Sequence, residues 1–133
     1  MARATSKTGA RPVSPHLQVY SWYLTMATSI LHRITGSALA LGLLLFTWWL
    51  TALARGPESF ATVQGVMHNV FGWLVLFGFT AALFYHTANG VRHLVWDAGY
   101  GLDKETARQS GIWTFAATGV LTVGFWLVVF LVA

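Results

Sequence analysis

The sequence has 133 residues, of which 56% are hydrophobic and 9% are charged, and its eight Lys and Arg against four acidic residues give a formal net charge of +4. A soluble domain has about 25% charged residues, so this composition excludes an ordinary soluble protein and indicates a membrane protein. The basic residues form no continuous stripe that could follow a phosphate backbone, which excludes nucleic acid as a partner, and the absence of cysteine excludes disulfides and thiolate metal sites.

Residues 1 to 23 form a basic tail. The tail carries Arg3, Lys7 and Arg11 and no acidic residue, and Pro12 and Pro15 disfavour a continuous helix. No long apolar stretch directly follows the first residue, so we expect no cleaved secretory signal. The acid-free start has a weak similarity to an organelle transit peptide, but it is short and leads directly into sequence that has the character of the mature protein.

Three apolar segments follow the tail, and each is long enough to cross a bilayer, which takes about 20 helical residues. The sequence therefore predicts an all-α membrane protein with a three-helix transmembrane domain over residues 24 to 133. Gly56 and Pro57 are helix breakers in the first polar connection, and several glycines mark the second. The predicted spans are residues 24 to 53, 66 to 95 and 112 to 132, and the predicted polar connections are residues 54 to 59 and 97 to 111.

The distribution of positive charge predicts the orientation of these spans. The tail and the second connection, which holds Lys104 and Arg108, are more basic than the first connection, which holds only Arg55. We therefore expect the N-terminus to face the cytoplasm or the mitochondrial matrix. The start of the first span and the end of the second then lie at the same membrane face. The polar groups that this arrangement gathers are Ser29, His32, Arg33, His86, Arg92, His93 and Asp97.

One face of the second span carries a stripe of unusual residues. His86, Gly90, His93 and Asp97 lie at i, i+4, i+7 and i+11, and titratable groups inside an apolar span usually mark a function. His86 should lie about 15 Å below the surface marked by Asp97. It could ligate a haem iron, with Gly90 allowing the macrocycle to lie against the helix, or it could hydrogen-bond to a neighbouring helix. The cations available to haem propionates would be His32, Arg33, Arg92 and His93.

The first span offers a second group of polar residues. Ser29 and Arg33 lie at i and i+4 and therefore share a helical face, which presents a hydroxyl and a cation to a lipid-soluble ligand. A quinone carbonyl accepts hydrogen bonds from such donors, and Asp97 could relay protons when the quinone is reduced. The alternative is that Arg33 extends to the membrane interface and that Ser29 bonds to its own helix backbone.

Two longer segments resemble a known family. Residues 11 to 36, RPVSPHLQVYSWYLTMATSILHRITG, and residues 86 to 101, HTANGVRHLVWDAGYG, are similar to the two signature segments of the cytochrome b membrane-anchor subunit of succinate dehydrogenase, respiratory complex II. The resemblance implies three transmembrane helices that form half of a heterodimeric anchor bundle. It implies that His86 is an axial ligand of haem b, with the opposite ligand supplied by a second, separately encoded anchor subunit. It also implies a ubiquinone site at Ser29, Arg33 and Asp97, and propionate contacts from His32, Arg33 and His93.

The same resemblance implies the function. The chain would anchor a flavoprotein and an iron-sulfur subunit and help to pass their electrons to ubiquinone, without itself oxidising succinate. We expect the bacterial inner membrane, with a cytoplasmic N-terminus, and the mitochondrial inner membrane is the alternative. Two other functions stay open at this point. One is a cofactor-free three-span scaffold or transport subunit, which the presence of haem would exclude, and the other is the anchor of a quinol:fumarate reductase.

Overall fold

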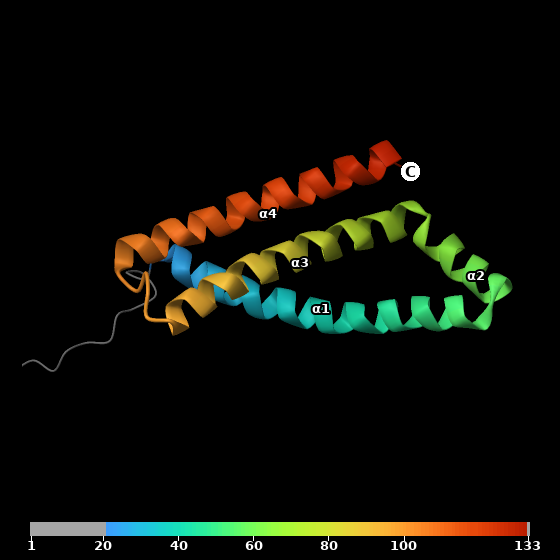
Figure 1. Ribbon diagram of the computed structural model, residues 1–133, viewed down its shortest axis with the longest axis horizontal. Coiled ribbons are helices and arrows are strands. Elements are labelled where there is room, and N and C mark those ends of the chain that lie inside the picture. Colours follow the sequence, from blue (N-terminus) through green and yellow to red (C-terminus); the bar gives the residue numbers. More distant parts are fainter. Residues whose placement is uncertain (1–20, 133) are drawn as a thin grey trace, which may run out of the picture.

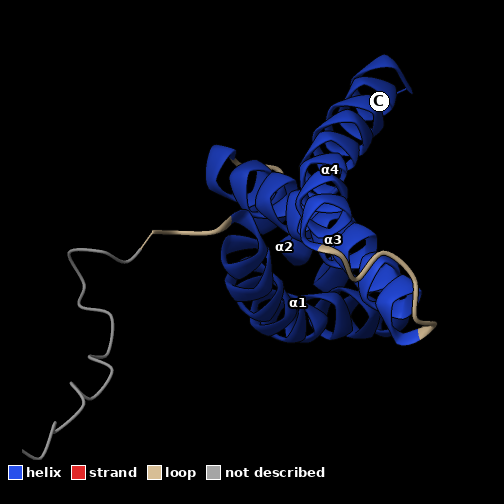
Figure 2. Ribbon diagram, turned by 90° about the vertical axis from the view of Figure 1, so that its left-hand side faces the viewer, coloured by secondary structure: helices blue, strands red, loops and turns tan. Residues whose placement is uncertain are grey.

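The computed structural model describes residues 21 to 132, and in this range it consists of helices joined by short loops, without a strand (Figure 2). Most of the predicted basic tail lies outside the described residues. The helices are α1 (Leu24–Arg55), α2 (Pro57–Met67), α3 (Val70–Asp97) and α4 (Lys104–Val132).

Three of these helices are long and apolar enough to cross a membrane. They are α1, α3 and α4, with 32, 28 and 29 residues. At a rise of about 1.5 Å per residue, each is longer than the hydrocarbon core of a bilayer, which is about 30 Å thick. Large apolar side chains cover their outer surfaces, as at Leu44 and Leu131, which are 67% and 85% exposed. Such surfaces require lipid or a partner protein around them, and the prediction of an all-α membrane protein is confirmed.

The connection between α1 and α3 is itself largely helical. Gly56 ends α1 with φ at 109°, in the left-handed region that favours glycine, and Pro57 occupies the first turn of α2. The predicted breakers therefore do end the first helix. The second span was expected to start at about residue 66, and in the structure the chain turns at His68 and α3 begins at Val70. The side chain of Asn69 caps α3 by accepting a hydrogen bond from the backbone N–H of Gly72, at 2.9 Å.

The last helix begins well before the third apolar segment. Residues 97 to 111 were expected to form a polar loop, but α4 starts at Lys104. Asp103 acts as its N-cap, because its carboxylate accepts a hydrogen bond from the backbone N–H of Thr106 at 2.9 Å. The loop before it is short because Gly99 and Gly101 adopt φ values of 86° and 69°, which allow tight turns. A polar sequence of good helix formers therefore extends the third span beyond its apolar part.

The three long helices pack with α3 between α1 and α4 (Figure 1). The start of α1, the end of α3 and the start of α4 meet at one end of the molecule, and α2 lies at the other. Close approach of α1 and α3 depends on Gly42, because a Cβ atom there would overlap the ring of Phe79. The buried side chains at the first end are mainly polar, and they include Thr28, Asn89, Arg92 and Thr114. Polar interior groups inside membrane helices are the natural place to look for a site.

Candidate functional site

Three histidines from α1 and α3 form a cluster, which we call the histidine cluster. The ring of His32 on α1 stacks on the ring of His86 on α3, with centroids 3.9 Å apart and planes within 7° of parallel. The ring of His93, two turns farther along α3, lies 5.3 Å from that of His32. All three residues were candidates from their pattern in the sequence, and the structure brings them together at the end of the bundle where α1 begins.

The hydrogen bonds of His86 determine which of its nitrogens carries the proton. Nδ1 lies 3.2 Å from the backbone carbonyl oxygen of His32 and 3.2 Å from the hydroxyl oxygen of Thr35. The Thr35 hydroxyl is 2.8 Å from the carbonyl of Leu31, to which it donates. A carbonyl oxygen can only accept, so Nδ1 of His86 is the protonated donor and Nε2 keeps its lone pair. Metal-bound histidines are commonly oriented in this way, by a carbonyl that accepts from the nitrogen that does not bind the metal.

A glycine on α1, Gly36, borders the His86 ring. A Cβ atom at Gly36 would lie 3.0 Å from Cε1 of His86, so only glycine lets the imidazole lie this close to α1. A Cβ atom at Gly90, one turn along α3, would meet nothing within 4 Å inside the chain. The buried Nδ1 of His32 has no hydrogen-bond partner among the described residues. A fixed imidazole with a free Nε2, an open helix face and an unsatisfied nitrogen nearby together fit a haem ligand site.

The described residues provide few ligand groups for a metal ion. Within residues 21 to 132, no group of three or more His, Asp or Glu side chains could hold a metal ion. His32 cannot serve as the second axial ligand to a haem held by His86, because its ring lies face to face with the His86 ring. Axial ligands instead approach the iron from opposite sides of the macrocycle. Of these two residues, only His86 is therefore placed to ligate such a haem.

The residues selected as quinone contacts lie on the outside of the chain. Ser29 is half-buried on α1, whereas Arg33 and Asp97 are exposed. Within the described part of the chain, the side chains of these three residues make no hydrogen bond or ion pair. The structure therefore does not join Asp97 to Ser29 or Arg33. The alternative considered from the sequence was that the Ser29 hydroxyl bonds to its own helix backbone. No such bond is present in the structure.

A buried polar network lies next to the cluster, between α1, α3 and α4. Arg92 is only 6% exposed, and its Nη1 donates to the hydroxyl oxygen of Thr28 at 3.1 Å and to Oδ1 of Asn89 at 3.2 Å. The hydroxyl of Tyr85 donates to the backbone carbonyl of Thr28 at 2.8 Å. Both bonds to Thr28 cross from α3 to α1. The network therefore fixes these two helices against each other at the turn that precedes His32.

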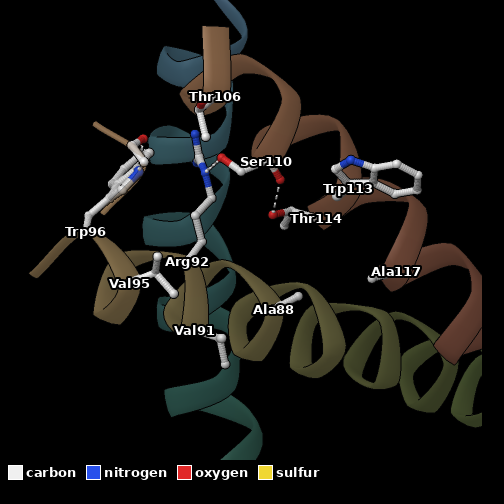
Figure 3. Close-up of a pocket in the computed structure, with 11 residues that line it drawn as sticks. Ala88, Val91, Arg92, Val95, Trp96, Thr106, Ser110, Trp113, Thr114 and Ala117 are labelled. Atoms are coloured by element: carbon white, nitrogen blue, oxygen red, sulfur yellow. Dashed lines mark hydrogen bonds between the residues drawn. The ribbon is translucent and has the colours of Figure 1, made fainter. Parts of the chain in front are cut away.

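The same guanidinium also holds α4. Its Nε donates to the hydroxyl of Ser110 at 2.9 Å and its Nη2 to the carbonyl of Ala107 at 2.7 Å, and its Cζ lies 4.0 Å from the ring centroid of Trp96. Figure 3 shows Arg92 reaching from α3 toward Ser110, beside a cavity of about 430 Å³ whose lining includes Trp113 and none of the three histidines. From the sequence, Arg92 was one of the cations expected to be available to haem propionates. In the structure its guanidinium instead connects α3 to α1 and α4 through hydrogen bonds.

Sequence reasoning did not select Thr28, Thr35, Tyr85 or Asn89. Threonine and tyrosine are ordinary residues in membrane helices and gave no signal by type. Asn89 could have been found, because a side-chain amide inside an apolar span is costly and it lies one turn from His86. In the structure its side chain is completely buried, and its Nδ2 has no hydrogen-bond partner among the described residues.

The fold and the site define a membrane protein of three spanning helices with a histidine cluster and a polar network at one end. A family model described as succinate dehydrogenase/fumarate reductase transmembrane subunit matches residues 7 to 130, so the chain belongs to this family. The succinate dehydrogenase cytochrome b556 subunit of Paracoccus denitrificans is 48% identical over 124 residues, which cover 93% of this chain and 95% of the relative. The mitochondrial cytochrome b560 subunit of Sus scrofa is 41% identical over 118 residues, covering 86% and 69%.

A more distant bacterial relative has the same description. The cytochrome b556 subunit of Rickettsia felis is 33% identical over 117 residues, which cover 88% of this chain and 91% of the relative. The predicted membership in the cytochrome b anchor subunits of succinate dehydrogenase is therefore confirmed. The chain is a multi-pass membrane subunit of a respiratory enzyme complex.

Proposed function

We propose that this chain is the membrane anchor of a succinate dehydrogenase that ligates haem b and helps to form the site where ubiquinone is reduced. The observation that carries the proposal is the geometry of His86, whose Nδ1 is tied to the carbonyl of His32 and whose Nε2 is left free to bind a metal. The names of the relatives, which are cytochromes, support the same conclusion. A haem bound there would supply a one-electron carrier between the soluble subunits and the quinone.

The histidine cluster would hold the haem as follows. His86 is the axial ligand, and the opposite axial ligand comes from a second membrane-anchor subunit, with which this chain forms a heterodimeric bundle. His32, Arg33 and His93 contact the propionates. The exposed guanidinium of Arg33 supports this assignment, because it is available to a carboxylate.

Ser29 and Arg33 would bind ubiquinone. Their side chains have no partner within the described residues, they share a face of α1, and both can donate a hydrogen bond to a quinone carbonyl. Asp97 would help to supply protons from the membrane surface, where α3 ends. In this arrangement the chain binds and orients the quinone, and the electrons come from the iron-sulfur subunit.

The soluble subunits would dock at the end of the bundle where α1 begins. The flavoprotein oxidises succinate, the iron-sulfur subunit conducts the electrons, and this chain itself does not oxidise succinate. We place the complex in the bacterial inner membrane with the N-terminus in the cytoplasm, which the positive charge of the tail supports. The mitochondrial inner membrane is the alternative.

A reduced-minus-oxidised difference spectrum of the purified complex tests the haem assignment. We expect a b-type signal in the wild type that is lost or shifted in His86→Ala. His68→Ala is the matched control, because His68 ends α2 at the opposite end of the molecule, and its spectrum should be unchanged. An assembled wild-type complex without a b-type signal would contradict the proposal and favour the cofactor-free scaffold.

The direction of the reaction needs a separate measurement, because the family's description also covers fumarate reductases. We expect the purified complex to reduce ubiquinone with succinate faster than it reduces fumarate with a quinol. The opposite ratio would identify the anchor of a quinol:fumarate reductase. Ser29→Ala and Arg33→Gln should raise the KM for ubiquinone without removing the succinate-to-dye activity of the soluble subunits.

A further inference from the structure

We propose that Tyr85 is a positioning residue for the quinone site, and that it acts by fixing the peptide unit from which Ser29 projects. This inference rests on the proposed function, because it requires that Ser29 binds ubiquinone. Tyr85 lies on α3, next to His86 in sequence, and has no place in the haem or quinone contacts described above.

Tyr85 on α3 is hydrogen-bonded to the main chain of α1. Its hydroxyl is 2.8 Å from the carbonyl oxygen of Thr28, and its side chain is only 5% exposed. The C=O of Thr28 and the N–H of Ser29 belong to a single planar peptide unit. A hydrogen bond to that oxygen therefore limits the rotation and displacement of the peptide plane that leads directly into Ser29.

Thr28 receives two hydrogen bonds from α3. Its side chain is 1% exposed, and its hydroxyl oxygen accepts from Nη1 of Arg92 at 3.1 Å while donating to the carbonyl of Thr25 at 2.9 Å. Both its main chain and its side chain are therefore bonded to α3. Hydrogen bonds in such a buried setting are stronger than at a wet surface. The turn of α1 that carries Ser29 is fixed by two donors from a neighbouring helix.

Within the described residues, no side-chain hydrogen bond fixes the position of Ser29. Its hydroxyl has no hydrogen-bond partner among residues 21 to 132, so its location follows from the backbone. In a regular α-helix the Thr28 carbonyl also accepts from the N–H of His32. The bond from Tyr85 is thus an additional constraint on a carbonyl that the helix already satisfies. Small displacements of a binding group strongly reduce its effect, so this constraint should matter for the quinone.

The test uses the whole purified complex and a double-mutant cycle. Tyr85→Phe removes only the hydroxyl, Ser29→Ala removes the proposed quinone contact, and the third variant combines both. Thr80→Val is the matched control, because the Thr80 hydroxyl on α3 bonds only to its own helix, at the carbonyl of Leu76. The readouts are kcat and KM for ubiquinone, the succinate-to-dye activity, and the haem difference spectrum.

We expect Tyr85→Phe to raise the KM for ubiquinone by about two- to tenfold, the range expected for the loss of one neutral hydrogen bond. The dye activity and the haem spectrum should stay as in the wild type. In the Ser29→Ala background, Tyr85→Phe should have little further effect, because the group that it positions is already gone. Thr80→Val should leave KM unchanged.

The possible failures can be told apart. If Ser29→Ala leaves KM unchanged, the proposed quinone contact itself is wrong. If Ser29→Ala raises KM but Tyr85→Phe does not, or if the two effects on KM multiply independently, the positioning role is overturned and the quinone site stands. Thr28→Val removes the second hold on the same residue and is read in the same way. If Tyr85→Phe does not assemble, an unchanged KM in Thr28→Val overturns the claim that fixing this turn of α1 matters for the quinone, and a raised KM that disappears in the Ser29→Ala background supports it.

Discussion

The hydroxyl oxygen of Thr35 lies 3.2 Å from Nδ1 of His86, across the contact between α1 and α3. Because the Thr35 hydroxyl donates to the carbonyls of Leu31 and His32, at 2.8 and 3.1 Å, it can only accept from the imidazole. Two acceptors on α1 thus share the Nδ1 proton of His86. With a haem bound at His86 as proposed, they would make Nε2 a better electron donor to the iron, and Thr35 would influence the haem potential through His86.

Thr35→Val tests this relationship. The variant keeps the side-chain volume but removes one acceptor, so His86 becomes a poorer donor and the oxidised haem is less well stabilised. We expect the midpoint potential of the haem to rise by an amount on the order of tens of millivolts, which corresponds to part of one hydrogen bond. Redox titration of the difference spectrum measures the shift. Thr35→Ser keeps the hydroxyl and should stay near the wild type, and a lower potential in Thr35→Val would contradict the argument.

Gly36→Ala should disturb the same ring by contact. Its Cβ atom would lie 3.0 Å from Cε1 of His86, which is closer than ordinary van der Waals contact, so the imidazole must move. We expect a smaller or shifted b-type signal per assembled complex, measured against the flavin content. Gly78→Ala is the control, because a Cβ atom at Gly78 meets nothing within 4 Å inside the chain. Equal spectra for the two variants would mean that the closeness of Gly36 and His86 has no role in haem binding.

The histidines of the site could be predicted, and their supports could not. His32, His86 and His93 stand out because titratable side chains are rare in apolar spans, and the alternation of successive spans predicts which helix ends meet. Thr35 and Tyr85 carry no such signal. Their function depends on which atoms they face on another helix, and helix contacts do not follow from the hydrophobic pattern of a single helix.

The helix boundaries differed from the prediction for a related reason. Hydrophobicity measures which residues suit the bilayer, whereas a helix begins where its first N–H groups find a cap. Asp103 followed by Lys104 and Glu105 is a good local start for a helix, although these residues are too polar for a membrane span. Asn69 similarly sets the start of α3, where only His68 and Asn69 interrupt an apolar segment.

Removing Arg92 should weaken the packing of all three membrane helices. Arg92→Leu leaves the buried hydroxyl of Thr28, the half-buried hydroxyl of Ser110 and the buried amide oxygen of Asn89 without their donor. We expect the free energy of unfolding to fall by about 3 kcal/mol or more. Arg92→Lys should cost less, because it keeps a donor. Thermal unfolding of the purified complex measures both. Arg108→Leu is the control and should stay within about 0.5 kcal/mol, because its ion pair with Glu105 is exposed.

The cap of α4 should make the start of this helix sensitive to pH. Hydrogen bonds from the side chain of Thr106, and then from its backbone N–H, hold the pKa of the Asp103 carboxyl below its ordinary value. Because the pKa is lower in the folded chain, the cap stabilises the helix fully above the ordinary pKa of aspartate. This contribution is lost as the pH falls through the lowered pKa.

Hydrogen exchange of the first turn of α4 measures this effect. At neutral pH we expect the amides of residues 104 to 108 to exchange faster in Asp103→Ala than in the wild type, because the variant lacks the carboxylate that accepts from Thr106. In acid, once the carboxyl is protonated, the difference should become small. Asp103→Asn can still cap the helix through its amide oxygen but does not titrate, so its protection relative to Asp103→Ala should not change with pH. A difference between the wild type and Asp103→Ala that persists unchanged in acid would show that the charge of Asp103 contributes nothing to the cap.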